Sequence, residues 1–384
     1  MKELLNMISK SRILFIISTL DRVGPTNVLF NLIRYLNRDK FDCAVLTLSP
    51  EKKSSRLSDF ISLGIPIFQV NQNRFFWLFS SARIRKFIKS YNPKILHSHS
   101  FRADFEIFRL RGNRLRIATL HADLKDNYCD TYGLLGGYLL ALLNFKVLRN
   151  FDWVVSCSKQ LHTKYMMDFS KSFIFNGIDE TEFSVPGPDR INSLKSKLLI
   201  QSDKVIFLFI GSFIDRKDPE TIIRAFQGMQ LKEQSLLILV GDGLLYRILQ
   251  RRYRHEKLIV FRNFTTGIND FFSVGNVLIS ASKSEGLPNV VLEAIGTGNN
   301  LLLSKIQGHL DIIENIQCEY DLFEIGDVTT LTGLMDKSVK SLMDTAYGRN
   351  KQVSLGSFTA RNMAENYGDL YELLIRQRFG SAEI

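Results

Sequence analysis

The chain has 384 residues, of which 45% are hydrophobic and 23% are charged. These proportions are typical of globular proteins and exclude a disordered or fibrous chain, and the length suggests two domains. The net charge is +11, and all of it lies in residues 1–185, which hold 27 basic and 16 acidic side chains, whereas residues 186–384 hold 23 of each. This asymmetry predicts two bodies with different partners.

The first half alternates short apolar runs with amphipathic segments such as Asn27–Leu36 and Ser80–Lys89. The apolar runs lack strict alternation, which is typical of strands buried on both faces of a parallel sheet. This rhythm predicts a Rossmann-like, doubly wound α/β domain over residues 1–185. The expected strands are Ile13–Ser18, Cys43–Leu48, Ile65–Val70, Ile95–Ser98, Arg116–Leu120, Trp153–Ser156 and Phe173–Phe175.

The Pro/Gly cluster Val185–Asp189 is expected to link two domains. The same rhythm then restarts, which predicts a second Rossmann-like α/β domain over residues 186–359. Residues Ala360–Gln377 have helical spacing, so we expect residues 360–384 to form a C-terminal helix that packs back on the first domain. Two such domains make a cleft for a ligand. The expected strands of the second domain are Val205–Ile210, Leu236–Val240, Leu258–Phe261, Val277–Ser280 and Leu301–Ser304.

The four cysteines lie far apart, and no Cys/His cluster has the spacing of a zinc site. They favour reduced, buried thiols in a cytoplasmic protein. The apolar run Ile13–Ile17 has no cleavage site after it, so we predict a first strand rather than a signal peptide. The longest apolar stretch, Leu134–Phe145, is too short to span about 30 Å of hydrocarbon. We therefore expect no transmembrane anchor.

The strongest local signal is the segment Ser284–Ala294, in which Glu285 and Glu293 are eight residues apart. It follows an expected strand, and Pro288 suits the first position of a helix, where its missing N–H costs nothing. Free amides at a helix start favour an anion. If the spacing were all helical, the carboxylates would lie about 12 Å apart along the axis, wider than the about 5–9.5 Å of a glycosidase pair. Two binding roles fit better than one hydrolytic site, although two such glutamates alone would also fit an ordinary exposed helix.

In this context the segment resembles the E-x7-E motif of the retaining nucleotide-sugar glycosyltransferases of family 4, which have the GT-B fold of two facing Rossmann-like domains. The resemblance extends over nearly the whole chain, and the glutamate segment is its most specific part. Further segments that resemble the family follow in its order: Leu20–Asn27, His97–Ser100, Thr119–His121, Ser156–Ser158, Asn176–Asp179, Gly211–Lys217 and Gly241–Gly243.

The resemblance implies which residues of the second domain hold a nucleotide-diphosphate sugar. Glu293 would bind the ribose hydroxyls, and Glu285 would bind the transferred sugar in a catalytic position. Asn263 stands where the family usually has a glycine whose backbone reads the nucleobase, so the base cannot be inferred. The residues expected around the sugar and phosphates beside Glu285 are Gly286, Leu287, Pro288 and Asn289.

The loop Gly211–Lys217 is expected to bind the donor diphosphate. Lys217 matches the family's lysine, but Ser212 stands at the position of the family's arginine, so Arg216 is predicted as the second cation. Fixed cations stabilise the charge that a leaving diphosphate gains, and an arginine offers bidentate phosphate contact that a serine cannot. The alternative is a solvated Arg-Lys turn.

Four residues of the first domain are candidates for the ligand edge of its sheet. Gly24 follows the first strand, where a glycine lets the backbone approach a ligand; a simple turn glycine is the alternative. His121 closes a strand and so faces this edge. The resemblance implies that it contacts the transferred sugar, with a structural role as the alternative. His97 and His99 share one face, and without a third ligand we favour packing or an acceptor-side role over a metal pair.

The sequence contains no Asp-x-Asp, no Walker motif and no G-x-G-x-x-G. With the resemblance, this predicts a metal-independent hexosyltransferase that has no cofactor and acts on a glycan or lipid-linked acceptor in cell-surface polysaccharide synthesis. Two alternatives stay open. One is a GT-B sugar-nucleotide epimerase or hydrolase, and the other is a non-catalytic GT-B-like binding subunit.

Two segments suggest that the first domain binds an anionic membrane surface. Asn73–Lys89 mixes aromatic residues with cations, and Lys146 and Arg149 follow the apolar stretch Leu134–Phe145. Residues 51–116 alone hold 14 basic and 4 acidic side chains. Core packing with solvated charges is the alternative. No nucleic-acid-binding motif accompanies the charge, so we expect a cytoplasmic protein at the inner face of the membrane and no nucleic-acid partner.

Overall fold

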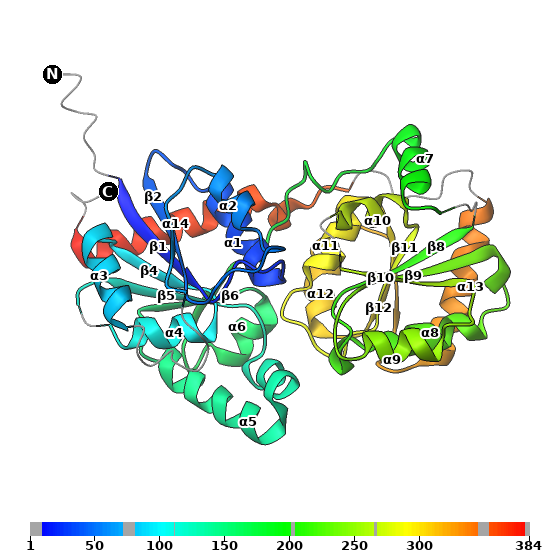
Figure 1. Cartoon of the computed structure of the whole chain (residues 1–384), viewed down its shortest axis with the longest axis horizontal. Helices are drawn as coiled ribbons and strands as arrows, with labels where there is room; N and C mark the ends of the chain where they lie inside the picture. Colours follow the sequence, from blue (N-terminus) through cyan, green and yellow to red (C-terminus); the bar gives the residue numbers. More distant parts are fainter. Residues whose placement is uncertain are drawn as a thin grey trace. The chain divides into compact units, whose positions relative to one another are not determined.

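The computed structural model describes residues 10–71, 81–110, 112–200, 204–264, 267–344 and 353–380. The chain divides into two compact units, Met1–Gly177 with Ser357–Ile384 and Ile178–Gly356. Each unit has a parallel sheet with helices packed on it (Figure 1). The predicted α/β class with two Rossmann-like units is confirmed.

The boundary between the units lies at Gly177, upstream of the Pro/Gly cluster where the sequence suggested a linker. The reason is packing of the stretch that follows Gly177. Ile178 is buried, and the Phe183 ring packs edge-on against Phe272 at 6.0 Å, both within the second unit. The Pro/Gly cluster instead leads into a helix of that unit, which begins at Pro188.

The first unit has a seven-stranded sheet in the order β3-β2-β1-β4-β5-β6-β7, with all neighbouring pairs parallel. The direction of strand addition reverses between β1 and β4, which is the place where α/β sheets bind ligands at their carboxyl edge. The strands are β1 (Ser11–Ile17), β2 (Phe41–Thr47), β3 (Ile67–Gln69), β4 (Ile95–Ser98), β5 (Leu115–Leu120), β6 (Trp153–Ser156) and β7 (Ser170–Phe173).

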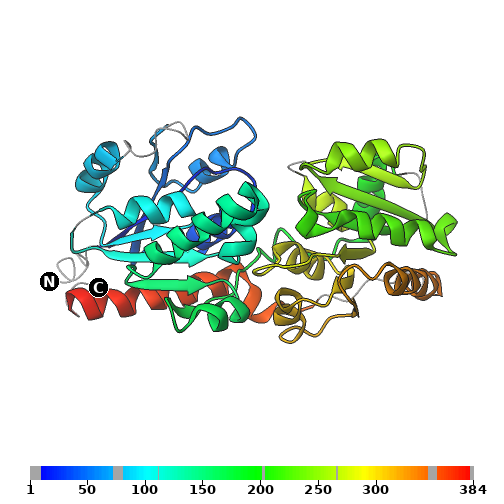
Figure 2. The ribbon, with the colours of Figure 1, turned by 90° about the horizontal axis from the view of Figure 1, so that it is seen from below.

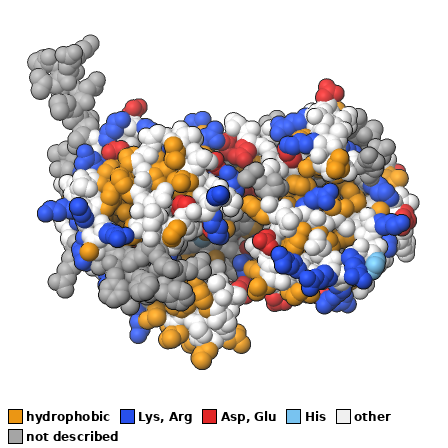
Figure 3. Space-filling view, viewed as in Figure 1, with side chains coloured by type: hydrophobic (Ala, Val, Ile, Leu, Met, Phe, Trp, Pro, Cys, Tyr) orange, Lys and Arg blue, Asp and Glu red, His pale blue; other side chains and the backbone are white. Residues whose placement is uncertain are grey.

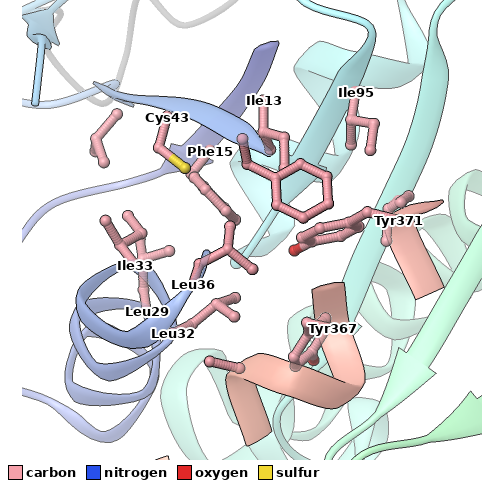
Figure 4. Close-up of a cluster of buried hydrophobic side chains, with 14 of the residues drawn as sticks. Ile13, Phe15, Leu29, Leu32, Ile33, Leu36, Cys43, Ile95, Tyr367 and Tyr371 are labelled. Atoms are coloured by element: carbon pink, nitrogen blue, oxygen red, sulfur yellow. The ribbon is translucent and has the colours of Figure 1, made fainter. Parts of the chain in front are cut away.

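One face of this sheet is covered by the first and last helices of the chain (Figure 2). Figure 4 shows Tyr367 and Tyr371 among the aliphatic side chains of this core. Their hydroxyls reach Thr119 Oγ1 at 2.8 Å and His97 Nδ1 at 2.7 Å, so no phenol is buried without a partner. The helices of the unit are α1 (Gly24–Tyr35), α2 (Leu57–Ser62), α3 (Ser81–Tyr91), α4 (Phe101–Phe108), α5 (Leu124–Leu148), α6 (Lys159–Tyr165) and α14 (Ala360–Phe379).

By length and apolar composition, α5 is the one helix of the described residues that could cross a membrane. The predicted apolar stretch Leu134–Phe145 forms part of it. The helix is interrupted at Gly133, whose φ of 76° and ψ of 170° are not helical. The part after Gly133 has 15 residues and is about 22 Å long at 1.5 Å per residue, which is shorter than about 30 Å of hydrocarbon.

The second unit has a six-stranded parallel sheet in the order β10-β9-β8-β11-β12-β13, which reverses between β8 and β11. Its last strand was not predicted because Tyr320–Phe323 lies at the sheet edge and is only partly buried. The elements are β8 (Val205–Ile210), β9 (Ser235–Gly241), β10 (Ile259–Asn263), β11 (Val277–Ser280), β12 (Asn300–Ser304), β13 (Tyr320–Phe323), α7 (Pro188–Lys197), α8 (Pro219–Gly228), α9 (Tyr246–Arg252), α10 (Ile268–Val274), α11 (Asn289–Gly296), α12 (Gln307–Ile313) and α13 (Val328–Asp344).

The return of α14 to the first unit gives a test at Gly177. A Cβ at this position would overlap the carbonyl of Thr359, just before α14 begins. We expect Gly177→Ala to lower the free energy of unfolding of the first unit by about 1–3 kcal/mol, because the backbone must shift. Urea unfolding followed by tryptophan fluorescence reports on this unit, since both tryptophans of the chain fall within the sequence range 1–177. Gly136→Ala, where the nearest atom is 3.9 Å from the added carbon, is the control, and an equal loss in both variants would contradict this packing.

Candidate functional site

The loops that follow β8 and β11 meet at the switch point of the second sheet. Lys217 forms an ion pair with Glu285 through Oε1, and Arg216 lies 3.2 Å from Oε2 of the same carboxylate. Arg216 also donates to the carbonyl oxygen of Ser284 at 2.8 Å, and Ser282 donates to Glu285 at 2.8 Å. The structure therefore brings together the two cations predicted for a diphosphate and the carboxylate predicted for a sugar.

The charge state of Glu285 follows from these contacts. Burial alone would raise its pKa, but the charges of Lys217 and Arg216 and the hydrogen bonds from Lys217 and Ser282 lower the pKa to about 2. The carboxylate is therefore ionised at neutral pH, where it accepts hydrogen bonds and cannot act as a general acid. Two cations against one anion leave this cluster with a positive charge in excess, which favours an anionic ligand.

The loop between Glu285 and α11 packs against the start of α12. A Cβ at Gly308 would lie 2.9 Å from the carbonyl oxygen of Glu285, so the two backbones are in close contact. His309 is fully buried, with its ring nitrogens 2.7 Å from the Ser304 carbonyl oxygen and 3.0 Å from Ser280 Oγ. Sequence analysis missed Gly308 and His309; the only available signal was that a Gly-His pair follows a strand of the same sheet.

The start of α11 differs by one residue from the prediction. The helix begins at Asn289, and Pro288 is the N-cap in an extended conformation, with φ of −78° and ψ of 103°. The prediction of Pro288 as the first helical residue was wrong because its backbone angles are not helical. Its carbonyl oxygen nevertheless accepts a hydrogen bond from Val291 N at 3.0 Å, as expected for an N-cap residue. Gly286, Leu287 and Pro288 are buried, Asn289 is half-buried, and Glu293 is 8% exposed one turn inside the helix.

The glycine pair Gly241 and Gly243 brings a neighbouring loop to the same edge of the sheet. Their φ angles are 156° and 149°, and a Cβ at Gly243 would lie 2.6 Å from the carbonyl oxygen of Phe213. Only glycine fits where this loop lies against residues 211–213. Asn263 ends β10 in register with Gly241 and is exposed, so the predicted base position lies at this edge.

In the first unit the loops after β1 and β4 meet at the switch point, where the hydroxyls of Ser18 and Ser100 are 3.0 Å apart. Gly24 begins α1, and nothing lies within 4 Å of where its Cβ would be. Protein packing therefore does not require a glycine there. Open space beside this backbone is compatible with the predicted approach of a ligand, which stays a prediction.

Three histidines lie side by side at the end of this sheet. His97 is fully buried between Tyr371 and Thr119, whose hydroxyls are 2.7 and 2.8 Å from its ring nitrogens. Nδ1 of His99 lies 3.1 Å from Nε2 of His121, which is half-buried. Burial lowers the pKa of His97 to about 3 and of His121 to about 4, and it also lowers that of His99. All three are neutral at pH 7.

His97 thus has the packing role that the sequence favoured, and Tyr371, some 270 positions away in the chain, is the partner that sequence analysis could not supply. Within the described ranges, no three His, Cys, Asp or Glu side chains are arranged to hold a metal ion. Gly24 and His121 belong to the first unit, and the other predicted site residues belong to the second.

Comparison with family models gives two matches in succession along the chain. Residues 24–182 match the model described as Glycosyltransferase Family 4, and residues 191–341 match the model described as Glycosyl transferases group 1. The first covers most of the first unit and the second covers most of the second unit.

The similar proteins cover between about half and nearly all of the chain. The Escherichia coli O-antigen biosynthesis glycosyltransferase WclY is 22% identical, over 95% of this chain and 99% of its own. The E. coli UDP-Gal:alpha-D-GlcNAc-diphosphoundecaprenol alpha-1,3-galactosyltransferase is 27% identical over 56% of each chain. The crystal structure of Anabaena HepE in complex with UDP-glucose has a TM-score of 0.72 and 16% identity, over 97% of both chains. This last likeness shows the shared fold.

The buried His97 gives a testable pH dependence. An unfolded histidine has a pKa of about 6.5, whereas folded His97 stays neutral far below that value, so protons bind the unfolded state first. The stability that neutral His97 contributes is complete above pH 6.5 and falls by about 1.4 kcal/mol per pH unit below it. The difference in unfolding free energy between wild type and His97→Gln should therefore shrink by about 2 kcal/mol from pH 6.5 to 5.

Urea unfolding with tryptophan fluorescence at several pH values measures this difference. Asp104, whose pKa burial raises to about 6, acts in the opposite direction but is common to both proteins. His162→Gln, which changes a half-buried histidine of the same unit, is the control. A difference between wild type and His97→Gln that is constant over this range would contradict the neutral, buried ring.

Proposed function

The chain belongs to the GT-B glycosyltransferases of family 4 type, and from this premise we propose that it is a retaining hexosyltransferase that uses a nucleotide-diphosphate sugar and needs no metal. The observation that carries the proposal is the cluster of Lys217, Arg216 and Glu285 at the switch point of the second sheet. Two fixed cations suit a diphosphate, and an ionised, largely buried carboxylate suits the hydroxyls of a sugar.

The proposal distributes the donor over neighbouring loops. Lys217 and Arg216 bind the diphosphate, and Glu285 with the segment 286–289 binds the sugar. Glu293 accepts from the ribose hydroxyls, and the base lies by Asn263 at the end of β10. In the first unit, Gly24 and His121 are the proposed contacts to the donor. The neutral ring of His121 donates or accepts one hydrogen bond without adding charge at the reaction centre.

In the proposed reaction the bond between the anomeric carbon and the diphosphate oxygen breaks, and its electron pair leaves with the diphosphate. The acceptor oxygen bonds to the same face of that carbon, so configuration is retained. The proton of the acceptor hydroxyl passes to the leaving phosphate. Lys217 and Arg216 stabilise the charge that develops there, and Glu285 orients the sugar without donating a proton.

The proposed acceptor is a glycan or a lipid-linked sugar in cell-surface polysaccharide synthesis. The similar E. coli proteins are named for O-antigen biosynthesis and for a diphosphoundecaprenol-linked substrate. The structural neighbour HepE was crystallised with UDP-glucose, which makes UDP the first nucleotide to test. The proposal places the enzyme in the cytoplasm, at the inner face of the membrane.

A thermal-shift panel of UDP-, GDP- and ADP-sugars tests the proposal. A ligand that binds only the folded protein stabilises it by about 2.7 kcal/mol at a hundredfold excess over its dissociation constant. We expect one nucleotide series to raise the melting temperature, and acceptor-dependent release of that nucleoside diphosphate. Release of the nucleoside diphosphate without acceptor would indicate a hydrolase. Conversion of the donor into a different nucleotide sugar would indicate an epimerase, and donor binding without turnover would indicate a non-catalytic subunit. No shift with any donor would contradict the proposal.

The role of Glu285 is tested by removing its charge. We expect Glu285→Gln to lower kcat at least about 100-fold, because the sugar loses an ionised acceptor. The same change should leave nucleoside diphosphate affinity equal or higher, since Lys217 and Arg216 lose their competing anion. Titration calorimetry and product release measure the two effects. Glu314→Gln, on the exposed end of α12, is the control, and loss of nucleotide affinity with kcat unchanged would refute this assignment.

The role of Arg216 as the second cation is tested by moving the charge. We expect Arg216→Ala to weaken donor binding about tenfold, and Ser212→Arg in that background to restore part of it, because a cation returns to the same loop. Arg251→Ala, on the exposed face of α9, is the control. If Arg216→Ala binds donor as wild type does, the second cation lies elsewhere.

A further inference from the structure

The polarity of helix α5 is the reverse of that of an ordinary surface helix. Large apolar side chains on its second part are exposed, whereas the small residues Gly137 and Ala141 and the polar residue Asn144 are buried. The exposed residues follow the spacing i, i+1, i+4, i+5, i+8, i+9, which places them on one side of a helix. They are Leu134 (83% exposed), Leu135 (88%), Tyr138 (51%), Leu139 (59%), Leu142 (44%) and Leu143 (42%).

Buried contacts hold this side outward. Asn144 donates to Asp104 Oδ2 at 3.0 Å and accepts from the Tyr128 hydroxyl at 2.9 Å, and Ser98 donates to the other oxygen of Asp104 at 2.6 Å. A Cβ at Gly137 would overlap the backbone of Cys129, so the two parts of α5 are in close contact there. Rotation of the helix to bury its leucines would break the Asn144 bonds and this contact.

The exposed face is therefore a fixed feature in need of an apolar partner. Contiguous apolar patches of this kind are uncommon on soluble monomers and mark interaction sites. Figure 3 shows hydrophobic side chains gathered where α5 lies in the first unit. Met166 and Met167, 52% and 89% exposed, follow α6, next to Phe169, whose ring packs edge-on against Phe145 of α5 at 5.4 Å.

The cations that follow the face favour a lipid surface over a second copy of the chain. Residues 134–145 contain no charged side chain, and the exposed Lys146 and Arg149 follow directly. The first 185 residues carry a net charge of +11. Two copies joined through this face would bring like charges together, whereas anionic head groups attract them. Long cationic side chains also reach head groups while an adjacent apolar face enters the acyl region.

The other segment suggested by the sequence does not supply such a face. In α3, Ile84 and Ile88 are buried, and the cations Arg83, Arg85 and Lys86 are exposed. This is core packing with solvated charges, the alternative that the sequence left open. Residues 73–80 of that segment lie outside the described part of the chain.

We propose that the outer face of α5, from Leu134 to Leu143, inserts into the interface of an anionic bilayer, with Lys146 and Arg149 at the head groups. The part of α5 after Gly133 is too short to span the membrane and is fixed to the protein by its other side, so it lies in the interface. This inference rests on the proposed function only in naming a lipid-linked acceptor, which such an orientation would bring within reach. Vesicle binding itself needs no donor.

The test is co-sedimentation of the full-length protein with vesicles. We expect binding to vesicles rich in phosphatidylglycerol and at least about tenfold weaker binding to phosphatidylcholine vesicles. Leu135→Gln/Leu139→Gln should lower binding to the anionic vesicles at least about tenfold. Lys146→Gln/Arg149→Gln should weaken binding and reduce its dependence on salt. The control is Ile61→Gln/Ile248→Gln, which changes two other exposed apolar residues and should bind as wild type does.

Three results would overturn the proposal. These are absence of vesicle binding by wild type, equal binding by wild type and Leu135→Gln/Leu139→Gln, and a concentration-dependent dimer that this double variant abolishes while vesicles are not bound. The last would assign the face to a second copy, as sedimentation velocity would show. The donor thermal shift, measured on the same proteins, tests the proposed function independently of vesicle binding. Vesicle binding lost in the double variant supports the proposal even if no donor binds wild type.

Discussion

The ion pairing of the Glu285 carboxylate, whose side chain is 9% exposed, with Lys217 and Arg216 is the interaction on which the rest of the account depends. Bringing three charged groups out of water is costly unless they compensate one another. The fold meets this requirement by bringing two loops into contact at the point where the strand order of the sheet reverses. Helix α12 packs against the backbone of Glu285. A ligand that brings a diphosphate and hydroxyls would find both signs of charge already fixed in place.

The first unit has the same architecture, but its buried polar groups hydrogen-bond to one another and fix the packing of its helices. Its polar groups lie deep within the sheet and its covering helices, where His97 is held by two hydroxyls and Asp104 by Ser98 and Asn144. These contacts fix the positions of α14 and α5. One consequence is a neutral histidine cluster at the carboxyl edge, and another is a leucine-rich face that cannot turn inward. The positive charge of this half of the chain favours an anionic surface as the partner of that face.

The sequence predicted much of this because the strands of a parallel sheet are continuous apolar runs, and because ligand loops follow those strands. The resemblance to family 4, carried by loops that follow those strands, pointed to Glu285 and Lys217, and Arg216 was predicted as the second cation. Their mutual ion pairing was not, since nothing in the local sequence reveals that residues 217 and 285 meet. Tyr371 and His309 were missed for the same reason. The edge strand Tyr320–Phe323 was missed because an edge is only half-buried. Whether the leucines of α5 face the core or the outside was left open, because an apolar run looks the same whichever side is buried.

The most direct measurement compares the affinity of a nucleoside diphosphate with that of its monophosphate, in wild type and in Lys217→Ala, by titration calorimetry. If the cluster binds the terminal phosphate, its removal should weaken binding about 10–100-fold in wild type and only a few-fold in the variant. An equal loss in both proteins would show that the phosphate lies away from Lys217, and the assignment of this cluster would be wrong.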